Sequence, residues 1–158
     1  MDDVIIARAL HVLAVVLWIG GVSMVTMVFL PALRQGRFGQ DWFSAFQAVE
    51  HRFSGLARSA IVVVGLTGFY MCWRLDLWDR FRAPRFWWMY AMLGVWLLFV
   101  LVLFIVEPLL LRRHFQERAK REPARAFAWL HRAHWLLLAL SGLTIAGAVM
   151  GSQGWWQR

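Results

Sequence analysis

The sequence predicts an all-α integral membrane protein, a four-helix bundle with both termini on the same side of the bilayer. Of its 158 residues, 61% are hydrophobic and 16% are charged, whereas a soluble domain carries about 25% charged residues. Four apolar stretches are long enough to cross a bilayer, since a spanning helix needs about 20 mostly apolar residues. The 11 Trp and 12 Phe exceed what a small soluble core could bury, and they suit a lipid-facing surface.

A single transmembrane domain covering the whole chain contains four predicted spans, at about residues 4–30, 53–73, 86–111 and 126–150. An amphipathic run from Asp41 precedes the second span. Pro31 is expected to end the first span and Pro84 to open the third, whereas Gly151 and Gly154 close the fourth. Length favours helices over the strands of a membrane barrel, which need only about 9–11 alternating residues.

Basic residues determine the predicted orientation, because Lys and Arg near spans favour the cytoplasmic side. Nine lie in the first and third connecting segments: Arg34, Arg37, Arg52, Arg112, Arg113, Arg118, Lys120, Arg121 and Arg125. Five lie in the second connecting segment and the tails: Arg74, Arg80, Arg82, Arg85 and Arg158. This bias predicts both termini outside, in a bacterial-type inner (plasma) membrane.

His11 lies seven residues into the first span, about 10 Å below the outer boundary at a rise of 1.5 Å per residue. Ionisable residues inside a membrane are costly and are candidates for function. The imidazole could bond a neighbouring backbone or hydroxyl group, or it could be an axial ligand of haem iron. Because no second His is expected in the same leaflet, a haem there would be five-coordinate or held by a His/Met pair.

A second group of ionisable side chains is expected at the inner end of the bundle. His51 precedes the second span, and Arg58 continues the same polar stripe. Glu107 lies about one turn inside the third span, while His131 and His134 share one face of the fourth. All five are expected to meet in one pocket.

Three interpretations of this pocket stay open. It could hold haem through two of the His residues, with Arg58 answering a propionate, because Arg matches carboxylate geometry. It could hold a simple metal ion through two or three His residues and Glu107. It could also be a solvated rim, with His and Arg side chains reaching lipid phosphates.

The segment Ala9-Leu10-His11-Val12-Leu13, followed by Trp18-Ile19-Gly20-Gly21, resembles the opening helix of the copper-resistance protein D (CopD) superfamily. Its small four-helix members include the bacterial membrane protoporphyrinogen oxidase, which binds haem b. The segment Phe46-Gln47-Ala48-Val49-Glu50-His51-Arg52-Phe53 resembles the F-x-V-M-E-R-R-L stretch of that oxidase. Topology, helix order and length agree over nearly the whole chain. The resemblance implies a haem-b bundle with His11 as an axial ligand.

One departure from this pattern bears on activity. Trp87-Trp88-Met89-Tyr90 stands where the oxidase has W-L-H-x-K, so the His and Lys of that motif are missing here. The departure argues against protoporphyrinogen oxidation and leaves a haem-binding relative.

The leading hypothesis is therefore a small membrane haem-b protein that passes electrons, to or from quinone or a redox partner protein. Its ligands are expected from His11, His51, His131 and His134. The alternatives are a copper-binding or copper-uptake membrane protein using the same His with nearby Met, and an accessory membrane subunit without a cofactor. Lipid is the expected surroundings, and homo-oligomerisation stays open. The net charge of +8 lies mostly beside apolar runs, which argues against a nucleic-acid partner.

Overall fold

The computed structural model of the chain describes residues 1–35, 42–115 and 121–155. In these ranges the chain is helical and has no strand. Four helical stretches within them are long and apolar enough to cross a membrane: Asp2–Arg34, Phe46–Arg74, Pro84–Leu109 and Ala124–Ser152. The predicted all-α architecture with four candidate spans is therefore confirmed.

The first helix runs without interruption through α1 (Asp2–Met24), the π-helical η1 (Val25–Phe29) and α2 (Leu30–Arg34). The expectation that Pro31 ends this helix is wrong. Pro31 has no N–H to donate, and its ring crowds the preceding turn. The wider π turn directly before Pro31 accommodates the ring, and continuing the helix keeps backbone groups bonded where lipid offers no partner.

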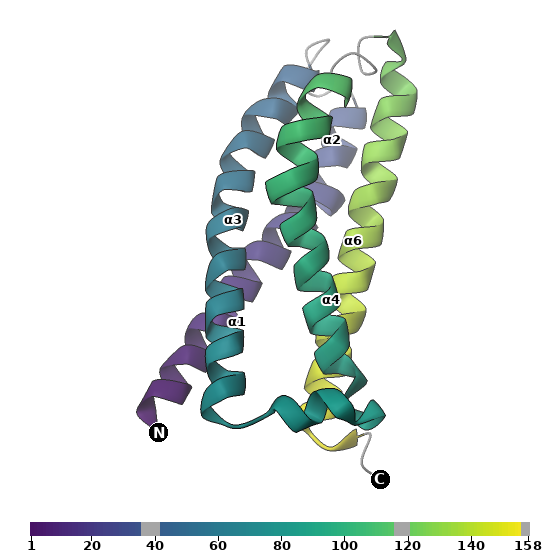
Figure 1. Cartoon of the computed structure of the whole chain (residues 1–158). Helices are drawn as coiled ribbons and strands as arrows, with labels where there is room; N and C mark the ends of the chain where they lie inside the picture. Colours follow the sequence, from purple (N-terminus) through teal and green to yellow (C-terminus); the bar gives the residue numbers. More distant parts are fainter. Residues whose placement is uncertain (36–41, 116–120, 156–158) are drawn as a thin grey trace.

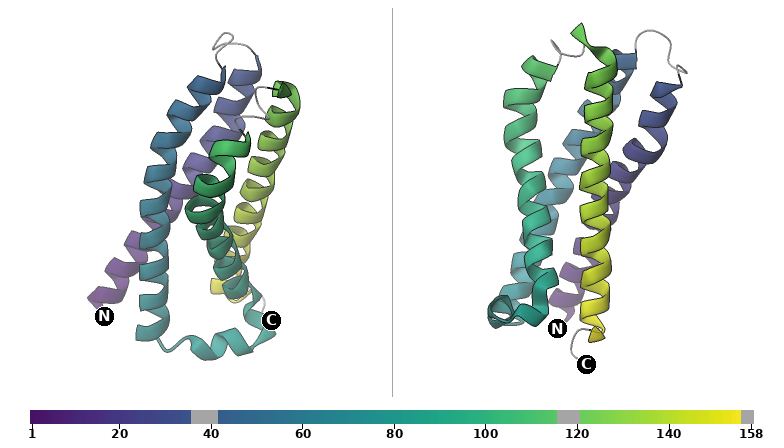
Figure 2. Two further views of the ribbon diagram at one scale, coloured as in Figure 1. Left: turned by 45° about the horizontal axis from the view of Figure 1, so that its top comes forward. Right: turned by 90° about the vertical axis from the view of Figure 1, so that its right-hand side faces the viewer.

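The remaining segments follow in up-and-down order: α3 (Trp42–Arg74), the short 3₁₀ turns η3 (Trp78–Arg82) and η4 (Pro84–Phe86), α4 (Trp87–Leu101), the π-helical η5 (Val102–Phe115), and α6 (Pro123–Ser152). From Trp42 on, the amphipathic run before the second span is thus part of α3, whereas its predicted first residue, Asp41, lies outside the described residues. In Figure 1, α1 begins and α6 ends at the same end of the bundle, the terminal end. α3 and α6 begin at the opposite end, and both views of Figure 2 agree with this arrangement.

Small residues let helices approach closely at the terminal end. A Cβ on Gly151 of α6 would lie 2.4 Å from the Trp88 ring, and one on Gly147 would lie 2.5 Å from the Trp87 ring. These two Trp begin α4, and their rings occupy the space left by the missing side chains of Gly147 and Gly151 on α6. Contact through small residues is the usual way for helices to pack in lipid.

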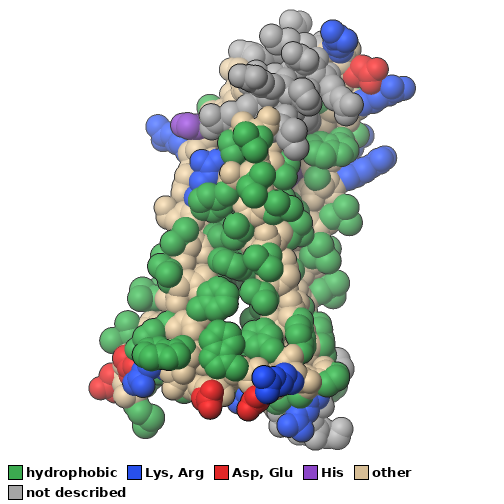
Figure 3. Space-filling model, viewed as in Figure 1, with side chains coloured by type: hydrophobic (Ala, Val, Ile, Leu, Met, Phe, Trp, Pro, Cys, Tyr) green, Lys and Arg blue, Asp and Glu red, His purple; other side chains and the backbone are tan. Residues whose placement is uncertain are grey.

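The surface has the polarity expected of a protein in a bilayer. Figure 3 shows charged side chains gathered at the two ends, with a broad hydrophobic band between them. Exposed aromatic side chains lie near both ends of the spans: Trp73, Trp78, Trp87, Tyr90 and Trp155 toward the terminal end, and Trp129 and Trp135 toward the opposite end. Such belts occur at the two membrane–water interfaces. The described residues thus have the build of a multi-pass membrane protein.

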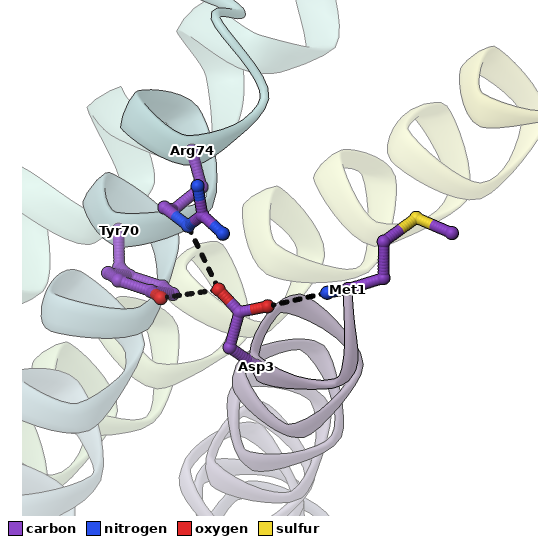
Figure 4. A network of polar contacts seen from close by, with 4 residues as sticks. All are labelled: Met1, Asp3, Tyr70 and Arg74. Atoms are coloured by element: carbon purple, nitrogen blue, oxygen red, sulfur yellow. Dashed lines mark hydrogen bonds and ion pairs between the residues drawn. The ribbon is translucent and has the colours of Figure 1, made fainter.

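A polar clasp joins the start of α1 to the end of α3 (Figure 4). The Asp3 carboxylate accepts hydrogen bonds from the Tyr70 hydroxyl at 2.7 Å and from the Arg74 Nε at 2.9 Å. Its other oxygen lies 3.2 Å from the amino group of Met1. The clasp fixes how α1 and α3 are aligned along their length, and this alignment positions His11 against α3.

Candidate functional site

His11 lies against α3, in the half of the bundle toward the terminal end. Its Nδ1 is 3.0 Å from the Oγ1 of Thr67, and the imidazole is half-buried. The Thr67 hydroxyl is in turn 2.6 Å from the backbone carbonyl of Val63. A carbonyl oxygen can only accept, so the single hydroxyl proton of Thr67 is donated to Val63.

This arrangement favours the tautomer of His11 that carries its proton on Nδ1. With the Thr67 proton directed to Val63, Thr67 Oγ1 would accept a hydrogen bond from an N–H at His11 Nδ1. In the neutral imidazole Nε2 then has an unshared electron pair. A His whose Nδ1–H is bonded to a neighbour while Nε2 stays available has the usual form of a metal-ligating His.

Two further features describe the surroundings of His11. A Cβ on Gly68 would lie 3.3 Å from Cε1 of the imidazole and 3.7 Å from Nδ1, so the ring edge rests on a residue without a side chain. Trp18, seven residues along α1 from His11, is 4% exposed, and its Nε1 has no hydrogen-bond partner in the described part of the chain. Buried polar groups normally have a partner. A half-buried imidazole and an unpaired indole N–H thus lie on one helix, α1.

Toward the opposite end, Arg58 of α3 and Glu107 of η5 form an ion pair inside the bundle. The Nη2 of Arg58 lies 3.1 Å from Oε1 of Glu107, and the two side chains are 31% and 7% exposed. The Oε2 of Glu107 is buried and has no donor among the described residues. The structure thus brings together two of the five residues expected to share the inner pocket.

Arg58 also donates a hydrogen bond to a backbone carbonyl of η5 that has no partner within the helix. In a π-helix the N–H of each residue bonds the carbonyl five residues earlier. Pro108 lies inside η5 and has no N–H, which leaves the carbonyl of Leu103 without its partner in this ladder. The Nε of Arg58 donates to that carbonyl at 3.1 Å. Two of the donor nitrogens of Arg58 are therefore engaged with η5.

The three His residues expected in the same pocket do not share a partner. His51 is exposed on α3. The Nε2 of His131 accepts a hydrogen bond from the indole N–H of Trp135 at 3.0 Å, which occupies its lone pair. His134 is half-buried, and its Nδ1–H donates to the Leu130 carbonyl at 2.9 Å, which leaves Nε2 available. Among the described residues, no three His, Cys, Asp or Glu side chains are placed to hold a metal ion together.

The His and Glu side chains described above lie apart from one another, which favours a ligand that needs only one coordinating side chain. A bare cation at Glu107 would have the positive guanidinium of Arg58 as its neighbour, which opposes binding. Haem needs only one or two axial ligands from a protein, so a single available imidazole meets its requirement. Arg58 is engaged by Glu107 and by the Leu103 carbonyl, which leaves it less able to bind a propionate.

Thr67 and Leu103 are the residues that the sequence did not indicate. Thr67 is one of several hydroxyl residues on apolar helices, and its role depends on the alignment of α3 with α1. Leu103 acts through its backbone carbonyl, and the only sequence signal was Pro108 five residues later.

No family model matches the chain, and neither a curated protein nor a solved structure is significantly similar to it. The resemblance to the CopD superfamily therefore stays a prediction. What the structure defines is the class: a helical chain with four candidate membrane spans, a half-buried imidazole at one level and an internal ion pair at another.

Proposed function

We propose that this chain is a small membrane protein that binds haem b through His11 and passes electrons, with quinone or a redox partner protein as the other reactant. The observation that carries the proposal is the 3.0 Å contact of His11 Nδ1 with Thr67 Oγ1 within an apolar span, because a proton on Nδ1 leaves Nε2 with an unshared electron pair. Bound haem would supply one-electron chemistry at the iron. A Met of the same leaflet could hold the group together with His11, or His11 could hold it alone.

The side chains of the protein would hold the haem and shield it from water. Thr67 sets the tautomer of His11 and the rotation of its ring, which a neighbour bonded to the second ring nitrogen normally does for a metal-bound His. The Trp18 indole N–H is a donor for a bound group. Burial between helices would keep water from a group held at His11 and would thereby adjust its reduction potential.

The copper-binding alternative has less support in this arrangement. It requires several ligands close together, whereas His131 accepts from Trp135 and Glu107 pairs with Arg58. The cofactor-free accessory subunit is the outcome that remains if neither haem nor metal binds.

The orientation proposed for the chain is that both termini lie outside, in a bacterial-type inner membrane. The two termini share one end of the bundle, and the excess of Arg and Lys lies in the segments of the opposite end. His11 then lies in the outer leaflet and the Arg58–Glu107 pair in the inner one.

The proposal is tested on the full chain purified from membranes of cells supplied with a haem precursor. Absorption spectra of the oxidised and reduced protein are recorded, and metals are measured on the same sample. The proposal expects a haem-b spectrum that responds to reduction and about one iron per chain. Copper without haem bands supports the alternative, and a sample with neither supports the accessory subunit.

A further inference from the structure

The segment between α3 and α4 runs across the terminal end of the bundle (Figures 1 and 2). Its apolar side chains Leu77 and Phe81 pack against a cluster formed by Phe86, Trp88 and Met89. Its charged side chains, among them Asp76 and Asp79, are exposed. The segment therefore lies where the apolar band ends, at the level expected for lipid headgroups (Figure 3).

Four arginines of this region fall into two pairs. Arg74 and Arg82 each have a carboxylate, since Arg74 lies 2.9 Å from Asp3 and Arg82 lies 3.4 Å from Asp79. Arg80 and Arg85 have no carboxylate partner in the described residues, although both are exposed. Two of the four positive charges are therefore not neutralised by the protein.

The two unneutralised arginines converge on one aromatic ring. The guanidinium carbon of Arg80 lies 5.2 Å from the centroid of the Phe86 ring, and that of Arg85 lies 5.0 Å from it. Phe86 is 8% exposed, so its ring is a fixed support. A guanidinium held against a ring keeps its N–H groups directed outward, and these groups match the oxygens of a phosphate.

We propose that Arg80 and Arg85, held on Phe86, bind the phosphate of an anionic phospholipid at the terminal end. The inference is independent of haem and rests on the chain spanning a membrane. The headgroup would offer oxygens to both guanidinium groups, while its acyl chains would extend along the exposed apolar surface of the spans. Trp73 and Trp78 are exposed nearby and suit the same interface.

The test is native mass spectrometry of the full chain in detergent, titrated with phosphatidylglycerol or with phosphatidylcholine. The double variant Arg80→Gln/Arg85→Gln should lose about 25-fold in phosphatidylglycerol affinity, because it removes the charge-assisted hydrogen bonds of both guanidinium groups to the phosphate. Arg82→Gln is the matched control, because it removes one exposed charge of the same segment and should cost less than about twofold. Phe86→Leu keeps both charges and should cost about threefold by removing the ring.

Three results would overturn the proposal. An Arg82→Gln loss as large as that of either single variant, Arg80→Gln or Arg85→Gln, would show that only overall charge matters. Equal binding of phosphatidylcholine and phosphatidylglycerol by the wild type would show that the site does not select an anionic lipid. Displacement of the lipid by millimolar inorganic phosphate would identify a site for free phosphate instead. Helical circular dichroism of each variant verifies that it is folded.

Discussion

Arg58 donates from its Nε to the backbone carbonyl of Leu103 at 3.1 Å, across the interface between α3 and η5. That carbonyl is the one that Pro108 leaves without a donor in the π-helical ladder. The same guanidinium neutralises Glu107 at 3.1 Å. Arg58 thus pairs two groups of η5: the Leu103 carbonyl, which Pro108 leaves without a donor, and the buried carboxylate of Glu107.

The first prediction concerns this junction. Arg58→Leu should lower the free energy of unfolding by about 2–3 kcal/mol, because it leaves both the Leu103 carbonyl and a buried carboxylate unpaired. The double variant Arg58→Leu/Glu107→Leu should be more stable than the single variant, since it also removes the isolated charge. Unfolding in mixed detergent micelles measures both.

Pro108→Ala is the matched control for the hydrogen bond from Arg58 to the Leu103 carbonyl. It restores an N–H, so the cost of Arg58→Leu should be smaller by about 1 kcal/mol in the Pro108→Ala background. Strict additivity of the two substitutions would show that Arg58 acts on Glu107 alone.

The second prediction concerns the contact between α4 and α6. Gly151→Ala should destabilise the chain by about 1–3 kcal/mol, because its Cβ would lie 2.4 Å from the ring of Trp88, which is 5% exposed and cannot move aside. Gly142→Ala on the same helix meets nothing within 4 Å and should be neutral or slightly stabilising. Thermal unfolding in detergent compares the two, and equal effects would contradict the packing described for Trp88.

The third prediction concerns orientation. In a Cys72→Ala background, Asp79→Cys at the terminal end should react with a membrane-impermeant maleimide on intact spheroplasts. Gln35→Cys, exposed toward the opposite end, should react only after permeabilisation. The reason is the excess of Lys and Arg in the segments at the end near Gln35. The reverse labelling pattern would place both termini inside.

The spans could be predicted from the sequence, because a bilayer requires long apolar helices whatever their packing. The meeting of Arg58 and Glu107 was also predictable, since two opposite charges at one depth in lipid need each other. The prediction that Pro31 ends the first helix was wrong, because a π-helical turn before the proline lets the helix continue through it. Thr67 was missed because helices that are apolar all round give no signal for which faces meet.

The fourth prediction tests the role of Thr67. Thr67→Val keeps the shape of the side chain and removes the acceptor for His11 Nδ1–H, so haem affinity should fall about 10–100-fold. Thr67→Ser keeps the hydroxyl and should stay within about threefold of the wild type. A haem titration followed by absorbance measures both, and identical affinities for the Val and Ser variants would remove Thr67 from the site.

The fifth prediction concerns His11 itself, and its measurement is the haem content per chain of His11→Ala beside that of His51→Ala. Both substitutions remove one imidazole, but His11 is half-buried against Thr67 whereas His51 is exposed. If His11 is the axial ligand, the His11→Ala protein should purify folded and nearly without haem, while His51→Ala should keep the wild-type content. Wild-type haem content in His11→Ala would contradict the account.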